Sequence, residues 1–129
     1  MKKTYKTSEV LSIFSELEKF MKKDMALPAR LVWSLDDNYE AMNTIVKKFY
    51  KHRDKLLGEL KEKGAFDGVG EDGKLKIKEE FKKEVSDAEF ALFEFSNIEN
   101  EVEIAVVGRD CIPEVLSVQD YRALKFMIE

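Results

Sequence analysis

The sequence is poor in residues that cross-link or break a chain. It holds one cysteine, one histidine, one tryptophan, two prolines and six glycines in 129 residues. A single cysteine excludes an intrachain disulfide, and no ligand spacing indicates a zinc site. The low proline and glycine content excludes collagen-like and low-complexity chains. A chain of 15.0 kDa can bury a hydrophobic core by itself, so we expect one domain over residues 1–129.

Long apolar runs are also absent. No stretch approaches the roughly 18 uncharged apolar residues of a transmembrane helix. The first six residues include three lysines, but the apolar stretch that follows is interrupted by Glu9, Ser12, Glu16 and Glu18. A signal peptide needs a continuous apolar region of about 7–15 residues. We therefore expect a soluble, cytoplasmic protein with no membrane partner.

Charges of opposite sign are segregated along the chain, although the net charge is only −4. Residues 41–63 carry seven basic side chains against three acidic ones, whereas residues 84–103 carry seven acidic side chains and no basic one. Such segregation is typical of packed elements or subunits that complement each other. A nucleic-acid-binding protein usually has a basic total and an uncovered basic stripe, so the pattern disfavours a nucleic-acid partner.

Helical periodicity predicts two helices in the first half, over residues 8–23 and 28–63. The first is expected to begin with Ser8 or Thr7 as its N-cap. The second is long and has an apolar stripe with a 3.5-residue repeat sustained over four heptads, which is typical of a supercoiling seam. That stripe consists of Val32, Leu35, Tyr39, Met42, Val46, Phe49, Arg53, Leu56 and Leu60.

The second half is expected to mix helices with a small β element. Residues 64–76 hold four of the six glycines and predict a loop with a turn at Asp72-Gly73. A helix over 78–93, a strand over 101–107 and a helix over 117–128 capped by Ser117 follow. The predicted fold is therefore mainly α (α+β): a long antiparallel helical hairpin with an N-terminal helix, a small β element and a C-terminal helix.

A single antiparallel helix pair cannot cover the whole stripe of the 28–63 helix, which predicts a protein partner and self-association as a homo-oligomer. Aromatic side chains and one seam arginine are the candidate contact residues, because such residues anchor interfaces. They are Trp33, Tyr39, Phe49, Arg53, Phe90, Phe93 and Phe95. A second candidate surface is acidic and consists of Glu94, Glu99, Glu101 and Glu103.

The sequence offers no coherent set of catalytic or metal-binding residues. His52 and Cys111 are 59 positions apart, and nothing in the sequence places them within the hydrogen-bond reach that a nucleophile pair needs. The glycine-acid segment 67–73 fails as a calcium loop, because Gly68 and Gly70 would occupy ligand positions. It also lacks the Lys-Ser/Thr of a phosphate loop. We expect no enzyme, no cofactor and no metal.

The order of these elements resembles a family of small uncharacterised proteins encoded by phages and prophages of Gram-positive Firmicutes. The resemblance spans about residues 8–129 and rests on five features. These are Leu27-Pro28-Ala29-Arg30, Glu71-Asp72-Gly73-Lys74, Glu80-Phe81 with Glu84, Val102-Glu103-Ile104, and Leu124 with Met127-Ile128-Glu129. The family supplies no catalytic residues. It implies a phage context, in the host cytoplasm, and function through protein contacts.

Two functions remain open at this level. One is a structural or assembly accessory that works through protein–protein contacts and self-association. The alternative is a phage-encoded inhibitor of a host defence system, because the acidic stretch 84–103 could imitate the charge of a nucleic acid.

Overall fold

A computed structural model describes all 129 residues and divides them into two compact units. The terminal unit comprises Met1–Lys47 and Glu99–Glu129, and the hairpin unit comprises Lys48–Ile98. Helix α2 (Ala29–Glu62) belongs to both units. The predicted mainly α fold with a small β element is confirmed, while the single-domain organisation stays a prediction.

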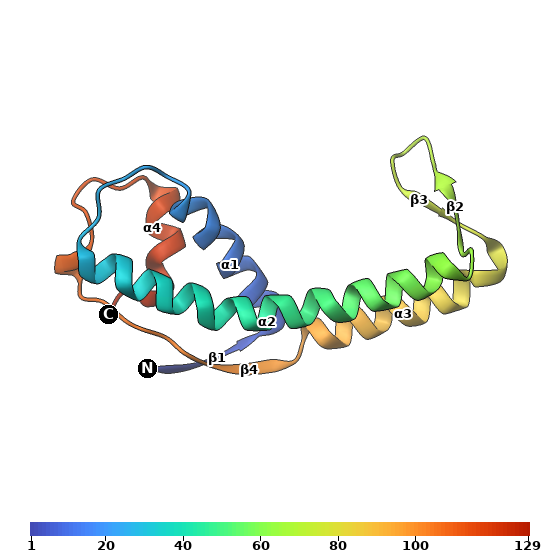
Figure 1. The fold of residues 1–129 in the computed structure, drawn as a ribbon, viewed down its shortest axis with the longest axis horizontal. Helices are drawn as coiled ribbons and strands as arrows, with labels where there is room; N and C mark the ends of the chain where they lie inside the picture. The colour runs from blue at the N-terminus through green and yellow to red at the C-terminus, as the bar shows by residue number, and fades with distance from the viewer. The chain divides into compact units, whose positions relative to one another are not determined.

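The terminal unit combines helices with a two-stranded sheet (Figure 1). Besides the first half of α2 it contains β1 (Lys2–Lys6), α1 (Thr7–Met21), β4 (Glu99–Glu103), the 3-10 turn η2 (Arg109–Cys111), α4 (Val118–Leu124) and the 3-10 turn η3 (Lys125–Met127). The predicted helix over 117–128 is thus a short α-helix that tightens into a 3-10 turn.

The two shorter helices of this unit begin differently. Ser117 caps α4, because its Oγ accepts the Asp120 backbone N–H at 3.0 Å, as predicted. The N-cap expected at Ser8 or Thr7 is wrong. Helix α1 begins at Thr7 after the extended residue Lys6, and the Glu9 carboxylate accepts the Lys6 N–H at 3.0 Å. An acid in the first turn therefore stabilises this end.

Strand β1 was not expected from the sequence, and it pairs antiparallel with β4 in a register that sets Lys2 opposite Glu103 and Lys6 opposite Glu99. The strand predicted over 101–107 is correspondingly shorter, since the ladder ends at Glu103. The following residues instead cross the core, and the Val107 N–H donates to the Met127 carbonyl at 2.8 Å.

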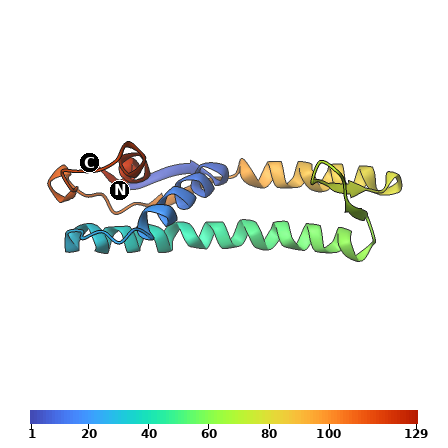
Figure 2. The ribbon, with the colours of Figure 1, turned by 90° about the horizontal axis from the view of Figure 1, so that it is seen from above.

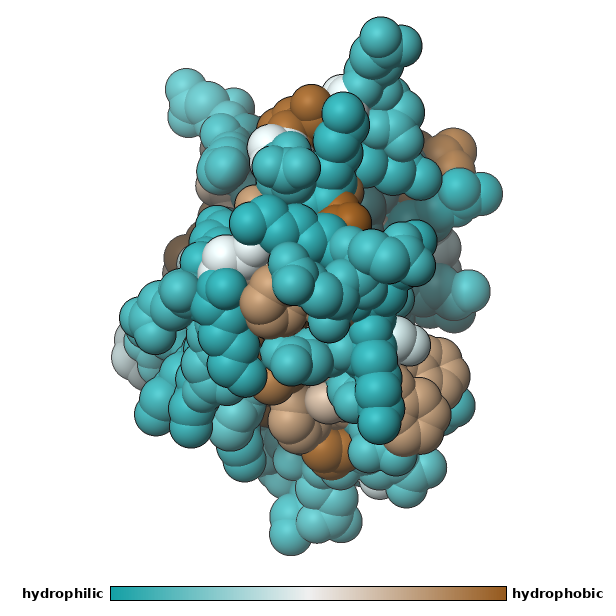
Figure 3. Space-filling view, turned by 90° about the vertical axis from the view of Figure 1, so that its right-hand side faces the viewer, coloured by the Kyte–Doolittle hydropathy of each residue, from teal (hydrophilic) through white to brown (hydrophobic).

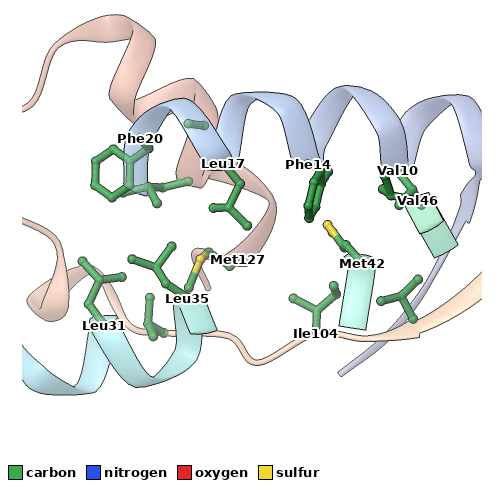
Figure 4. Close-up of a cluster of buried hydrophobic side chains, with 14 of the residues drawn as sticks. Val10, Phe14, Leu17, Phe20, Leu31, Leu35, Met42, Val46, Ile104 and Met127 are labelled. Carbon is green, nitrogen blue, oxygen red and sulfur yellow. The ribbon is translucent and has the colours of Figure 1, made fainter. Parts of the chain in front are cut away.

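The core of the terminal unit lies among α1, α2, the segment after β4 and the C-terminal helix (Figure 4). Phe14, Leu17 and Phe20 of α1 face Leu35 and Met42 of α2. Leu17 and Met42 have no exposed surface. Burying a side chain of this size contributes roughly 1.5–3 kcal/mol, so this cluster fixes how α1 sits on α2.

The predicted seam of α2 is wrong at its start. Val32 is 50% exposed, whereas Leu31 and Asn38 have no exposed surface. The buried stripe therefore runs through Leu31, Leu35, Asn38 and Met42, and Val32 turns outward. This stripe is covered within the chain by α1 and the C-terminal segments, so the first half of the predicted seam gives no reason to expect self-association.

The hairpin unit pairs the second half of α2 with α3 (Lys82–Ser96), which is preceded by the 3-10 turn η1 (Glu79–Phe81). The two helices lie side by side in both views (Figures 1 and 2). Lys63 Nζ lies 3.5 Å from Glu84 Oε2, and the His52 and Phe95 rings are 5.2 Å apart. Residue numbers rise on one helix as they fall on the other, so the predicted antiparallel hairpin is confirmed.

The loop predicted over 64–76 contains a small antiparallel hairpin, β2 (Phe66–Val69) and β3 (Leu75–Ile77). Its turn is closed by the Gly73 N–H, which donates to the Gly70 carbonyl at 3.0 Å. Gly73 has φ +78°, a left-handed conformation that favours glycine, as the Asp72-Gly73 pair predicted.

Candidate interaction surfaces

An open apolar groove of about 680 Å³ lies on the terminal unit, between the end of α1, the connection that follows it and the start of α2. It is lined by Phe20, Met21, Lys23, Met25, Leu27, Ala29, Val32, Trp33, Leu35 and Asp36. Phe20 and Leu35 form its base, because both are also members of the buried core. The floor of the groove is therefore held in place by core packing.

Trp33 is the most exposed aromatic side chain of the protein, at 75%. Successive residues of a helix are turned by about 100°, so the burial of Leu31 and Leu35 directs Trp33 away from the core. Val32 and Met21 are also large apolar side chains with much exposed surface. The predicted contact residue Trp33 thus stands at the edge of an apolar groove.

One ion pair fixes the polar side of this groove. The Lys23 ammonium pairs with the carboxylate of Asp120, whose side chain is only 7% exposed. The hydrogen bond from Lys23, with a further one from Ser117, holds the pKa of the Asp120 carboxyl below its usual range despite the opposing effect of burial. Lys23 follows α1 and Asp120 belongs to α4, so the pair ties these helices together.

A second apolar surface lies on α3 of the hairpin unit, where Phe90 is 61% exposed and Phe93 is 63% exposed. The side of α3 that faces α2 carries Val85 and Ala88, which pack with Leu60. Phe90 lies on the opposite side and Phe93 on the flank of α3, and both are exposed. Figure 3 views the molecule from the side on which the β2–β3 hairpin lies and shows a largely hydrophilic surface with separate hydrophobic patches.

The other predicted aromatic contact residues are partly covered. Phe95 is half-buried against His52, and Tyr39 stacks on Phe14 with ring centroids 4.8 Å apart. Phe49 meets Tyr50 edge-on at 5.6 Å. These three side chains contribute to packing inside their own units.

Arg53, the charged residue of the predicted seam, is half-buried. Its guanidinium carbon lies 4.4 Å from the centre of the Tyr50 ring, and its Nη2 lies 3.0 Å from Asp54 Oδ1. A cation over an aromatic face is attracted by the ring quadrupole. The charge is therefore balanced by neighbours on the same helix.

The predicted acidic residues are exposed, but three of them face basic or polar partners. Glu99 and Glu103 lie opposite Lys6 and Lys2 in the β1–β4 ladder, and Glu101 lies opposite Thr4. Opposite charges across a strand pair attract each other, so the lysines of β1 reduce the negative charge of this face. Glu94 is exposed on α3.

The residues considered for chemistry are not assembled into a site. His52 is exposed and lies beside Phe95, whereas Cys111 is buried, with 7% of its surface exposed. No group of three or more His, Cys, Asp or Glu side chains is placed to hold a metal ion.

Asn38 is a structural residue that the sequence did not single out. It is fully buried and pairs with the backbone of Ala105. Its only sequence signal is its position on the buried stripe, three residues after Leu35 and four before Met42.

None of the helices is both long enough and apolar enough to cross a membrane. Comparison of the sequence and the fold with known proteins finds no matching family model, no matching curated protein and no matching solved structure.

Proposed function

We propose that this chain is a phage- or prophage-type protein that acts through contacts with other proteins, as a structural or assembly accessory. The observation that carries the proposal is the groove beside Trp33. A large apolar side chain that is 75% exposed next to a concave apolar surface is typical of protein interfaces.

Two properties of the groove suit a protein partner. Its base is rigid, because Phe20 and Leu35 belong to the core, so little conformational entropy is lost when a partner binds. Its polar wall is defined as well, since Lys23 is held by Asp120. Apolar anchoring residues with a few fixed polar groups at the rim are the usual composition of a protein-binding site.

The alternative function, inhibition of a host defence system through an acidic surface, has weaker support. A surface that imitates a nucleic acid needs a strong uncompensated negative potential. Glu99 and Glu103 lie opposite Lys6 and Lys2, and this pairing lowers that potential. The apolar groove therefore supports the proposed function better than the acidic residues support the alternative.

The test is site-specific photocrosslinking in the cells in which the protein is made. A photoreactive phenylalanine analogue replaces Trp33, and the same analogue replaces exposed Lys61 in the control. We expect crosslinks from position 33 to one defined protein that position 61 does not capture. Equal capture from both positions, or none from position 33, would contradict the proposal.

The phage context has its own test in the neighbouring genes. A position among genes for head or tail proteins supports an assembly accessory. A position in an early or accessory cluster supports the inhibitor instead.

A further inference from the structure

The hairpin unit has too small a core for its length. Only three of its apolar side chains are buried, namely Leu60, Ala65 and Val85. The terminal unit buries fifteen in one cluster. Two helices with so few buried contacts gain little stability from each other, which makes a further packing partner for this unit favourable.

Two outer faces of this unit carry opposite charges. On α2, Lys48, Lys51 and Lys55 are exposed at steps of three and four residues, so they form one stripe. Lys51 precedes the buried Leu60 by nine residues, which places it about 180° around the helix. This basic stripe therefore points away from α3.

On α3, Asp87, Phe90 and Glu94 form the corresponding stripe, again at steps of three and four residues. All three are exposed, and they lie on the side opposite to Val85 and Ala88, which pack against α2. This acidic and aromatic stripe therefore points away from α2. The basic stripe and the acidic stripe lie on opposite sides of one hairpin.

From these faces we infer that the hairpin units of separate copies of this chain stack, with the acidic stripe of α3 on the basic stripe of α2 of the next copy. The inference rests on the proposed function and names one partner, a second copy. A symmetric contact of α3 with α3 is disfavoured, because it would bring Asp87 and Glu94 against their own counterparts, and like charges repel.

The charges also match at the two ends of α3. Within one hairpin, Lys63 lies level with Glu84, and His52 lies level with Phe95. A next copy stacked in the same orientation then brings Glu94 to the level of the neighbour's Arg53, two residues from Lys51, and brings Asp87 to the level of Leu60, beside the exposed Glu59. The same stacking brings Lys83, at the start of α3, to the level of Gly64, two residues from Glu62, so an exposed pair of reversed sign also comes close.

Phe90 and Phe93 would lie on the aliphatic parts of the lysine side chains in this contact, with the ammonium groups over or beside the rings. Long basic side chains bury their stems on apolar surface while the charge stays in water, and cations favour aromatic faces. Gly58 lies between the basic residues and Glu62 on α2, and a side chain there would meet nothing within 4 Å, so this position leaves room for a ring.

Because the two faces lie on opposite sides, one copy can bind two neighbours. A contact between different faces continues as a ring or an open row rather than closing as a dimer. We therefore expect the mass of the full chain, measured by sedimentation and light scattering, to rise with concentration beyond that of a dimer. Raising the ionic strength to about 1 M shortens the screening length to about 3 Å and should lower this mass.

Charge-swapped variants test the contact directly. Asp87→Lys with Glu94→Lys makes both faces basic, and Lys51→Glu with Lys55→Glu makes both acidic. Each double variant alone should associate at least about tenfold more weakly and keep its helix content by circular dichroism. An equimolar mixture of the two should associate again, because each variant then meets a face of opposite charge. Asp37→Lys with Glu40→Lys, an equal charge change at exposed positions of the terminal unit, is the matched control and should not alter the mass.

A monomer of 15.0 kDa at every concentration would overturn the inference. So would association that survives both charge reversals, or two folded variants whose mixture stays monomeric. None of these outcomes bears on crosslinking from position 33, which tests the proposed function at the other unit.

Discussion

The side chain of Asn38 pairs with the backbone of Ala105 through two hydrogen bonds. Its Nδ2 donates to the Ala105 carbonyl at 3.0 Å, and its Oδ1 accepts the Ala105 N–H at 2.7 Å. The side-chain amide thus replaces a neighbouring strand for Ala105, a residue that lies just beyond the β1–β4 ladder. A polar residue in the stripe of α2 positions the chain as it crosses the core.

Replacing Asn38 by alanine should lower the free energy of unfolding by about 2–4 kcal/mol, because two backbone groups lose their partners and each unsatisfied group costs about 1–3 kcal/mol. Urea unfolding followed by circular dichroism measures the change. Asn43→Ala, at a half-exposed position of the same helix, should change stability by no more than about 0.5 kcal/mol. Equal losses for both variants would contradict the role assigned to Asn38.

Asn38→Asp adds a pH signature to that prediction. An ionised carboxylate still accepts the Ala105 N–H, but it faces the Ala105 carbonyl without a proton to donate. The pKa of the new carboxyl should therefore rise on folding, and the variant should regain stability as the pH falls through that raised pKa. Unfolding curves at pH 7 and pH 5 should show a smaller deficit at pH 5, and a constant deficit would argue against this geometry.

Helical periodicity predicted the helices because their buried faces repeat at three and four residues. Strand β1 has no such signal. On the inner face of β1, only Tyr5 is apolar. Lys3 lies on the same face, and its ammonium donates to the Phe126 carbonyl at 2.5 Å. The strand exists because of β4, which lies more than 90 residues away in sequence, and a local pattern cannot reveal such a partner.

The candidate surfaces could be predicted only in part from the sequence. The sequence could identify Trp33, Phe90 and Phe93, because each is a large aromatic residue that lies outside the apolar stripe of its helix. The groove itself could not, because Met25 and Leu27 lie in a connection with no periodicity. Their closeness to Trp33 in space results only from the packing of α1 on α2.

Replacing Asp120 by asparagine should flatten the acid side of the stability curve. The folded-state pKa of Asp120 is lowered by Lys23, so its contribution is fully present above the unfolded value of about 3.9. It is lost as the pH falls through the folded value. Thermal unfolding from pH 6 to pH 3 should therefore show a smaller loss of stability for Asp120→Asn than for the unmodified chain. Asp37→Asn, at an exposed position, should keep the original slope, and an equal flattening by both would refute the assignment.

Helices α1 and α3 offer a comparison of local stability, because each has 15 residues. Five residues of α1 are buried but only Val85 of α3. Local opening is easiest where few apolar contacts must be broken, so the amides of α3 should exchange with solvent faster by at least about tenfold. Hydrogen exchange at a protein concentration too low for association measures this difference. Equal protection of the two helices would show that the hairpin unit is not the weaker one.

Trp33 and Leu35 lie two residues apart on α2, and replacement by alanine should lower stability at Leu35 but leave it nearly unchanged at Trp33. Leu35 is 3% exposed, so Leu35→Ala should cost about 2–5 kcal/mol of unfolding free energy through the cavity it leaves. Trp33 is 75% exposed, so Trp33→Ala should change stability by less than about 0.5 kcal/mol. Because Trp33 is the sole tryptophan, its fluorescence reports on the groove alone. The free protein should emit near the wavelength of tryptophan in water and be quenched freely by acrylamide. A blue-shifted, protected emission from the monomer would mean that the chain itself covers this side chain, and the groove would then not be free to take a partner.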